Sequence, residues 1–576
     1  MDFLLISPPV GNLGQAVSAV SVLTAFLRAR GWDAHQWDLS IDAFHHFHSS
    51  PYLERRQHIV RERGADAELL AAAERAVSEI DSAKEFFRQH DAAVRGDAMR
   101  WAFEVLRNAG VLITAASRGR YELDFRHFDI PGAVRDFSSL GDALEDDEAN
   151  PFIEFFREHA LPRLRQQAPA AVGISISYFT QLIPAFTLAR LIRQQLPATH
   201  LVLGGSYLTA TAADVIRIPA AVVPVDAIIL HDGEDALDAW LNAVVNGRGS
   251  TTDVPNVCLP RNGTFQRVSD RPPHTTDLAT LPVPMWTAQG LELDRYLVPK
   301  YAVGLPLTRG CHWGRCVYCN ISSQTSARYR RRDSAQAIAD MRAIMAETQS
   351  NWFDFPVDSY RPRDLWELSR AILAADLRIE WAAEVLLDRG FTESVLSDLW
   401  RSGCRCLRFG LESASPATLK AMRKPTRPES AAQVLAACKQ QGIRTGVMVI
   451  AGFPSETQAG LGETYNFLVS HSHAIDFVGI HPYSLVPGSA MAQNPGEFGL
   501  YLRPRAGVLT TSLPFASTNP VGMQNEDLPR VIAAMKAGLR EHYPDLGELW
   551  TAAIGGWMTF PACCASEHGS EAEAAP

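Results

Sequence analysis

Residues 305–320 read LPLTRGCHWGRCVYCN. An apolar, strand-like run opens this stretch, and the loop that follows holds three of the chain's nine cysteines, Cys311, Cys316 and Cys319. Thiolates that converge from a few residues of backbone are typical of an iron–sulfur cluster, and three ligands to a four-iron cluster would leave one iron open. Zinc with His312 as fourth ligand is the main alternative, although structural zinc sites usually pair their cysteines. A disulfide is a third interpretation.

Downstream of this strand, strand-like and helix-like segments alternate to about residue 490. The expected strands are LPLT, WFDFPV, IEWAAEV, CLRFGLE, GVMVIAG and FVGIHPY, with helices expected at 333–347, 364–375, 393–402, 430–440 and 458–470. Six such repeats predict a partial (β/α)6 barrel over residues 301–490, smaller than the usual barrel of about 250 residues. Ligands and chemistry collect in the loops after the strands of such barrels, and the cysteine loop is one of these.

The chain upstream also alternates strands and helices. The opening strand Phe3–Ser7, a helix over 16–31 and an apolar segment near Trp37 predict a βαβ unit. The pattern resumes with strands at Ala171–Ser177 and His200–Gly205 and with the segment 225–244. The fold class is therefore α/β, with an N-terminal, doubly wound, Rossmann-like domain over residues 1–247.

Three other regions interrupt these alternating patterns. Residues 45–167 carry helical periodicity and predict a helical insertion in the N-terminal domain. Residues 248–300 are rich in Thr, Pro and Asp, which is typical of a linker. Residues 491–576 are expected to form a small accessory region that ends in a disordered tail.

Composition excludes several functional classes. The formal charge of the 576 residues is −10, which argues against a nucleic-acid partner. No apolar run approaches the roughly 20 residues that span a bilayer, and the N-terminus MDFLLISPPV does not resemble a signal peptide. An odd number of cysteines in a large chain argues against a secreted disulfide scaffold. We therefore expect a cytoplasmic protein without a membrane partner.

The cysteine loop resembles the cluster loop of the radical S-adenosylmethionine (SAM) superfamily, in which three cysteines bind a 4Fe-4S cluster beside an aromatic residue, here Tyr318. CHWGRC has four residues between its cysteines where the commonest family spacing has three, a longer spacing that cobalamin-binding members share. FGLESASPATLKAMRKPT and TGVMVIAGFPSET resemble the family's fourth-strand and fifth-strand segments. The resemblance implies that SAM is bound by the side chains of Asp358, Glu412, Ser413, Val449 and Ile450.

In this resemblance each of these residues has a role. Asp358 would hold the methionine amino group, Glu412 and Ser413 would face the ribose and the methionine, and Val449 and Ile450 would pack on the adenine. Asp358 departs from the family's usual paired acids or Gly-Gly-Glu. A helix N-terminal charge is the alternative interpretation of Glu412.

The N-terminal domain resembles the cobalamin-binding domain that precedes the barrel in one large radical SAM class. LLISPPVG, VGISISYFT, LVLGGSYLTA and DAIILHDGEDAL carry the likeness. It implies that Ser175, Ser177, Gly204 and Gly205 line the cobalamin crevice at the strand ends. A tight strand-to-helix turn explains the two glycines equally well. The loop after the first strand contains no histidine, so no cobalt ligand is evident.

The resemblance implies a cobalamin-dependent radical SAM enzyme, with C-methylation of an unactivated carbon as the leading activity. One SAM would methylate the cobalt and a second would yield the radical that removes a substrate hydrogen. No cysteine precedes Cys258, so the second cluster of a methylthiotransferase has no ligands in the N-terminal region. Cyclisation, epimerisation or rearrangement is the first alternative, and a non-catalytic ligand-binding protein with a zinc knuckle is the second. The expected partners are a small-molecule or modified-peptide substrate and an electron donor such as flavodoxin or ferredoxin.

Overall fold

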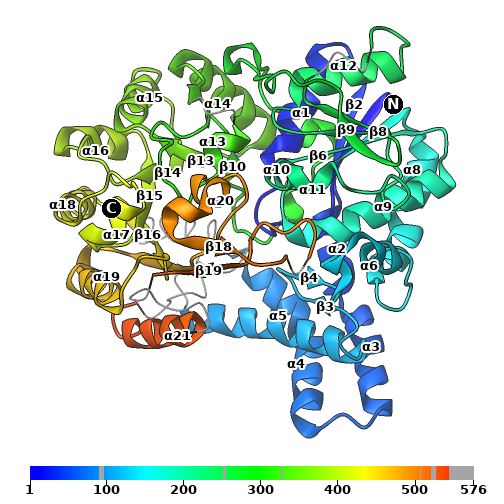
Figure 1. Ribbon diagram of the computed structural model, residues 1–576, viewed down its shortest axis with the longest axis horizontal. Helices are drawn as coiled ribbons and strands as arrows, with labels where there is room; N and C mark the ends of the chain where they lie inside the picture. The colour runs from blue at the N-terminus through cyan, green and yellow to red at the C-terminus, as the bar shows by residue number, and fades with distance from the viewer. Residues whose placement is uncertain (90–95, 251–254, 326–328, 506, 520–526, 544–576) are drawn as a thin grey trace, which may run out of the picture. The chain divides into compact units, whose positions relative to one another are not determined.

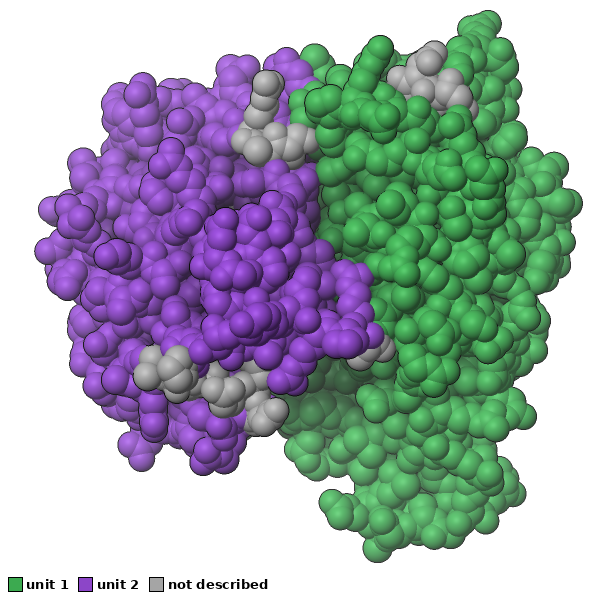
Figure 2. Space-filling model, in the orientation of Figure 1, with its two compact units in different colours: residues 1–276, 280–301, 506–511 green, residues 277–279, 302–505, 512–576 purple. Residues whose placement is uncertain are grey.

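The computed structural model describes residues 1–89, 96–250, 255–325, 329–505, 507–519 and 527–543, without the side chains of residues 96, 357 and 358. The chain divides into two compact units (Figure 2). Unit 1 comprises residues 1–276, 280–301 and 506–511, and unit 2 comprises residues 277–279, 302–505 and 512–576. Each unit is built around its own sheet.

A seven-stranded sheet forms the centre of unit 1 (Figure 1). Its parallel strands are β1 (Phe3–Ser7), β2 (Ala34–Asp38), β5 (Ala171–Ser175), β6 (His200–Gly204) and β7 (Ala227–Ile229), and the spatial order is β2-β1-β5-β6-β7. All five residues of β1 are buried, as expected where helices cover both faces of a parallel sheet. The doubly wound prediction is confirmed.

Helices cover this sheet on both sides. The helices that connect or follow its strands are α1 (Ser18–Ala29), α8 (Leu161–Gln167), α9 (Leu182–Gln195), α10 (Ser206–Ala210), α11 (Ala212–Val215) and α12 (Glu234–Val244). Helix α1 packs with α12, whereas α9 packs with α8. The chain winds from β1 to β2 in one direction and from β5 to β7 in the other. The topological switch point, where open α/β sheets bind their ligands, therefore lies between β1 and β5.

The insertion is helical, as predicted. It contains α2 (Leu39–Phe47), α3 (Ser50–Glu62), α4 (Ala67–Phe86), α5 (Gly96–Ala116), α6 (Phe137–Ala143), α7 (Pro151–Phe155) and a small hairpin of β3 (Glu122–Leu123) and β4 (Phe128–Asp129). Side-chain N-caps begin several of these helices: the Asp38, Ser49 and Asp66 side chains accept from backbone N–H groups of α2, α3 and α4. Helices α3, α4 and α5 pack against one another.

Part of the segment predicted to be a linker is instead regular structure. β8 (Val257–Arg261) and β9 (Thr264–Arg267) form an antiparallel hairpin that extends the sheet from β7. Asn262 and Gly263 turn between them with φ of 51° and 84°. Positive φ at both turn residues is the geometry that Asn-Gly favours in two-residue hairpins, so RNGT was a local hairpin signal. Residues 280–301 also belong to unit 1, where Trp286 is fully buried.

Six parallel strands form the sheet of unit 2, in the order β10-β13-β14-β15-β16-β17. They are β10 (Val303–Gly304), β13 (Trp352–Tyr360), β14 (Glu380–Leu386), β15 (Cys404–Glu412), β16 (Arg444–Ala451) and β17 (Phe477–Pro482). The helices between them are α13 (Ile321–Gln324), α14 (Ser334–Thr348), α15 (Pro362–Ala374), α16 (Glu393–Arg401), α17 (Pro416–Ala421), α18 (Pro428–Gln440) and α19 (Gln458–Ser470). The predicted six-repeat partial barrel is confirmed.

The first barrel strand begins two residues earlier than the predicted LPLT. β10 pairs with β13 through Val303 and Gly304, and the Leu305 N–H still donates to the Asp354 backbone carbonyl. Pro306 has no N–H, so it cannot continue the ladder. The chain then forms a separate antiparallel pair of β11 (Thr308–Arg309) with β12 (Arg330–Arg331).

The accessory region belongs to unit 2, except for residues 506–511, which belong to unit 1. It includes α20 (Ala490–Gln493), α21 (Leu528–Leu539) and the hairpin of β18 (Leu500–Leu502) with β19 (Phe515–Ser517). Met491, Leu500 and Phe515 join a buried cluster with Val317 of the cysteine loop. The predicted tail, residues 544–576, lies outside the described residues. Within the described part of the chain, no helix has both the length and the apolar content to span a membrane.

Candidate functional site

The cysteine loop lies at the carboxyl ends of the barrel strands. The Val317 N–H donates to the Met422 carbonyl (3.1 Å), and the Trp313 indole donates to the Arg423 carbonyl (2.9 Å), in the segment after β15. The Asn320 side chain donates to the Pro487 carbonyl (3.0 Å), after β17. The loop is thereby fixed above the barrel opening, where the sequence predicted it.

The three thiols of this loop form the candidate cluster site. Cys311, Cys316 and Cys319 are half-buried and free of disulfides, and the Cys319 sulfur accepts from the Ile321 N–H (3.5 Å). Burial raises the pKa of Cys316 to about 11, against the lowering effect of the nearby Lys424 ammonium. Three thiols on one short loop fit a cluster with three protein ligands. Among the described residues, no group of three or more His, Cys, Asp or Glu side chains has the arrangement of ligands to a single metal ion.

A buried ion pair lies beneath the loop. Lys424 Nζ donates to Glu412 Oε1 at 2.9 Å, and the two side chains are 3% and 12% exposed. Gly410 lies against both: a Cβ there would come within 2.6 Å of the Glu412 carboxylate and 2.9 Å of the Lys424 ammonium. A side chain at position 410 would clash with both partners, so the ion pair depends on the glycine on β15. Its Lys424 ammonium is the positive charge near the thiols.

Glu412 sits on distorted backbone at the end of β15. Its φ is +64°, and the pairing of β15 with β16 shifts register between Gly410 and Glu412. Such strain in a non-glycine residue is concentrated at functional sites. Burial, followed by the charge of Glu412, raises the pKa of Tyr318 well above its usual range, so Tyr318 stays a neutral phenol beside this carboxylate. The structure thus brings Tyr318 and Glu412 close to the cysteines of the loop.

Ser413 has a different environment from its predicted one. It is fully buried, its hydroxyl pairs with the Thr464 hydroxyl (3.0 Å), and it donates to Glu456 (3.4 Å). The Ser415 N–H also donates to the Ser413 oxygen (3.1 Å). These contacts engage the hydroxyl within the protein, so the structure gives Ser413 a role in holding the β15 and β16 ends together.

Glu456 is a site-adjacent residue that sequence reasoning missed. Its carboxylate accepts from the Gly452 N–H at 2.8 Å, closing the turn after β16. Burial raises its pKa to about 7. The signal was present as the glutamate of GFPSET, which lies four residues after that glycine.

Val449 and Ile450 point to opposite faces of β16, because successive strand residues alternate. Ile450 is half-buried and packs against the buried cluster that includes Val317, on the side of the cysteine loop. Val449 is fully buried on the other face. Met448 shares the face of Ile450 and is half-buried as well. The two residues predicted to pack on the adenine therefore lie on opposite faces of β16. Met448, and not Val449, shares a face with Ile450. The side chain of Asp358, predicted to hold the methionine amino group, lies outside the described residues.

The barrel interior holds charges that the sequence reading did not single out. Asp354, Glu384 and Arg408 lie on one sheet face, because Asp354 pairs with Ala382 and Glu384 pairs with Arg408 in register. Arg408 Nη2 lies 2.5 Å from the Asp354 carboxylate, and Arg408 Nε lies 3.5 Å from that of Glu384. Below them, an apolar layer closes the amino end: Ala302, Trp352, Ala382, Cys406 and Phe477. The alternation of charges within apolar strands was the available signal.

In unit 1, the predicted residues gather at the switch point. Ser175 ends β5 and is buried, Ser177 follows it and is half-buried, and Gly204 ends β6 beside Ser175 in register. A Cβ on Gly205, whose φ is +114°, would lie 2.1 Å from the Ile176 carbonyl oxygen. The close approach of the chain's own backbone therefore explains Gly205, as the tight-turn alternative predicted.

Gln181 is the residue of this crevice that the sequence reading missed. It is fully buried, and its amide donates to the Pro8 carbonyl (2.8 Å) after β1. Its side-chain oxygen accepts from the N–H groups of Ser177 (2.8 Å) and Tyr178 (3.2 Å) after β5. One side chain thus ties together the two loops that border the switch point.

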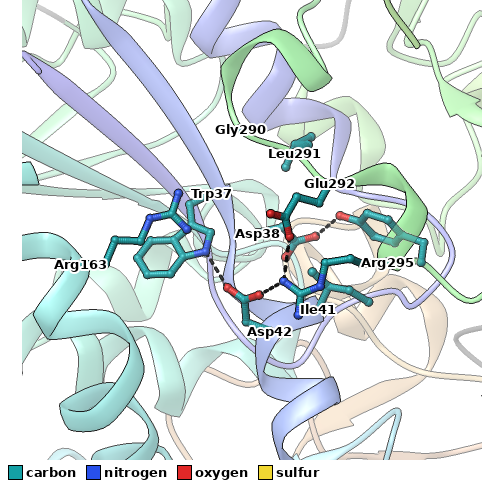
Figure 3. A pocket seen from close by; sticks show the side chains of 10 residues that line it. Trp37, Asp38, Ile41, Asp42, Arg163, Gly290, Leu291, Glu292 and Arg295 are labelled. Carbon is teal, nitrogen blue, oxygen red and sulfur yellow. Dashed lines mark hydrogen bonds and ion pairs between the residues drawn. The ribbon is translucent and has the colours of Figure 1, made fainter. Parts of the chain in front are cut away.

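A separate polar pocket lies at the carboxyl end of β2 in unit 1 (Figure 3). The Trp37 indole donates to Asp42 (2.6 Å), and Arg295 pairs with both Asp42 and Glu292. The Tyr296 hydroxyl donates to the buried Asp38 (2.6 Å), whose pKa burial raises. These contacts join residues 292–296 to β2 and α2, so the segment predicted to be a linker is docked on unit 1.

Comparison with known proteins agrees with this geometry. Residues 305–468 match the family model of the radical SAM superfamily. An uncharacterized methyltransferase of Pyrococcus horikoshii is 25% identical over 304 residues, which are 52% of this chain and 64% of that protein. The bacteriochlorophyllide d C-12(1)-methyltransferase of Chlorobaculum tepidum is 27% identical over 179 residues, 30% of this chain and 39% of that protein. The chain thus spans less than two thirds of the length of these relatives.

Solved structures share the fold of both units. The radical SAM methyltransferase TsrM from Kitasatospora setae, with cobalamin and a [4Fe-4S] cluster bound, has a TM-score of 0.55 at 15% identity, covering 88% of this chain and 82% of that one. The cobalamin-dependent radical SAM enzyme OxsB has a TM-score of 0.53 at 14% identity, covering 63% and 58%. The cysteine loop, the six-stranded barrel and the family match together identify residues 305–468 as a radical SAM domain, and the chain has the fold of the cobalamin-dependent radical SAM proteins TsrM and OxsB.

Proposed function

We propose that the chain is a cobalamin-dependent radical SAM methyltransferase that acts on an unactivated carbon of a small molecule or a modified peptide. The observation that carries the proposal is the three-cysteine loop fixed above the carboxyl ends of a six-stranded barrel. The likeness to TsrM, whose structures contain cobalamin, a [4Fe-4S] cluster and, in one case, tryptophan as substrate, supports both the cofactors and a small-molecule substrate.

In this proposal, Cys311, Cys316 and Cys319 hold a 4Fe-4S cluster, and SAM binds beside it. Together these groups supply a radical able to remove hydrogen from an unactivated carbon, and cobalamin carries the methyl group. The Lys424 ammonium compensates the negative charge that three thiolates bring into a half-buried loop. Glu412 in turn keeps that ammonium charged and positioned.

Other residues prepare the barrel for this chemistry. The apolar layer around Trp352 and Phe477 keeps water from the amino end of the barrel. Ile450 and Met448 offer an apolar surface for the adenine of SAM on the loop side of β16. Tyr318, as a neutral phenol, can donate a hydrogen bond and adds no charge. Asp358 as the partner of the SAM amino group stays a prediction.

Cobalamin would occupy the switch point of unit 1, beside Ser175, Ser177, Gly204 and Gly205. The buried Ser7 hydroxyl at the end of β1 has no hydrogen-bond partner in the described structure, which fits a crevice completed by a ligand. Residues 8–17 contain no histidine, so this loop offers no imidazole to the cobalt. We place the protein in the cytoplasm, where thiolate clusters are kept reduced, with an electron donor such as flavodoxin or ferredoxin.

The decisive experiment is iron, cobalt and zinc analysis of protein purified anaerobically from cobalamin-supplemented cells. About four irons and one cobalt per chain would support both cofactors. Cys316→Ala should lose the iron, whereas Cys438→Ala, which removes a buried thiol outside the loop, should keep it. Methylation then adds one CH₂ unit to the product mass. Iron without cobalt, or a product of unchanged mass, would favour cyclisation, epimerisation or rearrangement, and zinc alone would overturn the proposal.

A further inference from the structure

Four exposed cationic side chains lie in the cysteine loop and in the segment after β15 that the loop contacts. Arg315 lies within the loop, and Lys420, Arg423 and Arg427 follow β15. All four are exposed, and no ion pair of the described residues includes any of them. Elsewhere in unit 2, exposed arginines such as Arg378 and Arg363 are paired with carboxylates. We call these four side chains the basic patch.

Contacts place two members of the basic patch, Arg315 and Arg423, on the loop. The Arg315 guanidinium lies 5.4 Å from the centre of the Trp313 ring, and the Trp313 indole donates to the Arg423 carbonyl at 2.9 Å. The Arg423 guanidinium lies 5.9 Å from the centre of the Phe498 ring. The intervening Lys424 is buried and pairs with Glu412. Lys424 therefore places its charge near the thiols in the interior, whereas Arg423 and Arg427 are exposed to solvent.

The patch contrasts with the charge of the chain. Acidic residues outnumber basic ones by 64 to 54 over the sequence, so a cluster of unpaired cations is a local exception. Exposed acids also lie near its border, at Glu429 and Glu497, and the cations outnumber them. Exposed cations that are not neutralised by carboxylates create a positive electrostatic potential. Such a potential raises the rate of association with an acidic protein.

We propose that the basic patch is the docking surface for an acidic one-electron donor protein, such as a flavodoxin or ferredoxin. The inference rests on the proposed cluster at Cys311, Cys316 and Cys319. Docking there brings the donor's reduced cofactor next to the loop. One electron then passes from the donor to the cluster, so the donor is oxidised by one electron and the cluster is reduced by one. The charge pattern favours this occupant because exposed cations attract an acidic protein surface and repel a basic one.

The test uses the full-length, cluster-loaded protein and a charge reversal, Arg315→Glu with Arg423→Glu. Anaerobic stopped flow follows the loss of cluster absorbance on mixing with reduced flavodoxin, at several salt concentrations. Biolayer interferometry measures the binding of oxidised flavodoxin without any turnover. The reversal should lower the second-order rate constant at low salt about tenfold or more and should flatten its salt dependence. The melting curve and the iron content of each variant check that folding and loading are intact.

Arg378→Glu is the matched control. Arg378 is 87% exposed and precedes β14, at the amino end of the barrel, so its reversal should leave flavodoxin reduction unchanged. Dithionite, a small reductant, should bleach the cluster equally in all variants. Flavodoxin reduction and binding that survive the double reversal would overturn the docking proposal. Loss of turnover with dithionite, at normal iron content, would assign the patch to an anionic substrate instead. A parent protein with no cluster to bleach would refute the proposed function rather than the docking surface.

Discussion

Replacing Lys424 with methionine should destabilise the barrel around the cysteine loop by about 3–5 kcal/mol, the usual effect of removing one partner from a buried ion pair. Lys424 Nζ and Glu412 Oε1 are 2.9 Å apart, and the side chains are 3% and 12% exposed. At an effective dielectric constant near 20, that separation corresponds to roughly 6 kcal/mol of attraction. Desolvation offsets much of this, but the single substitution keeps the desolvated carboxylate and removes its counter-charge.

The second variant isolates the charge effect. Glu412→Gln with Lys424→Met leaves no buried charge, so the double variant should recover most of the loss, to within about 1–2 kcal/mol of the parent. Lys439→Met is the matched control, because Lys439 is 52% exposed and its contact with Asp476 is 3.3 Å. We expect an effect below about 1 kcal/mol there.

The assay has to report on unit 2 alone, since a chain with two units need not unfold in one step. Hydrogen–deuterium exchange, read on peptides from β15 and β16 in metal-free protein, meets this need. Lys424→Met should accelerate exchange in these peptides by a factor of about 150 to about 4,000, which corresponds to the predicted free-energy change. If Lys424→Met exchanges like the Lys439→Met control, or if the double variant is no better than the single one, the pair is not the stabilising element argued above.

Three further changes test other parts of the structure. The raised pKa of Glu456, about 7 in the fold against 4.5 as the ordinary value, means that the folded chain holds this proton to higher pH than the unfolded chain does. The stability that this proton contributes below pH 4.5, about 3 kcal/mol, is therefore lost as the pH rises through 7. Glu456→Gln should flatten the dependence of the melting temperature on pH between 5 and 8. Parallel slopes for the parent and the variant would contradict this. Gly205→Ala, at a φ of +114°, places a Cβ 2.1 Å from the Ile176 oxygen and should lower the melting temperature of unit 1 far more than Gly31→Ala, where φ is +91° but no atom lies within 4 Å; equal effects would show that the positive φ alone matters. Arg295→Ala removes the partner of two carboxylates and should weaken the docking of residues 280–301 by about 1–3 kcal/mol, seen as faster chymotryptic cleavage within that segment; unchanged cleavage would mean that buried aromatic side chains hold it alone.

Local sequence signals accounted for most elements, because the strands are apolar runs of the expected length and side-chain caps mark helix starts. The hairpin at Asn262 and Gly263 shows where composition misled: Thr, Pro and Asp content suggested a linker, while a two-residue turn signal between strand-like runs was the better guide. Trp286 shows the same point, because a large apolar residue within a polar segment found a buried position.

In the candidate site too, local signals predicted some residues, whereas residues that act through contacts between distant segments were missed. Neighbours in the loop, such as Cys316 and Tyr318, were identified from their spacing, because one short loop keeps them together in space. Lys424 and Glu456 were not, because their roles come from contacts across β15 and β16 that no local pattern specifies. Val449 could have been separated from Ile450 by strand alternation alone.

The crevice of unit 1 has one consequence for thermodynamics. Gln181 connects the loops after β1 and β5, and the contact of Gly205 with Ile176 fixes β6 against β5, so both walls are already set before any ligand arrives. Little backbone freedom is left for a ligand to remove, and the entropy cost of ordering, which weakens binding at flexible sites, is small here. Association at this crevice should therefore be governed by diffusion and desolvation, and slow conformational phases should be absent from its binding kinetics.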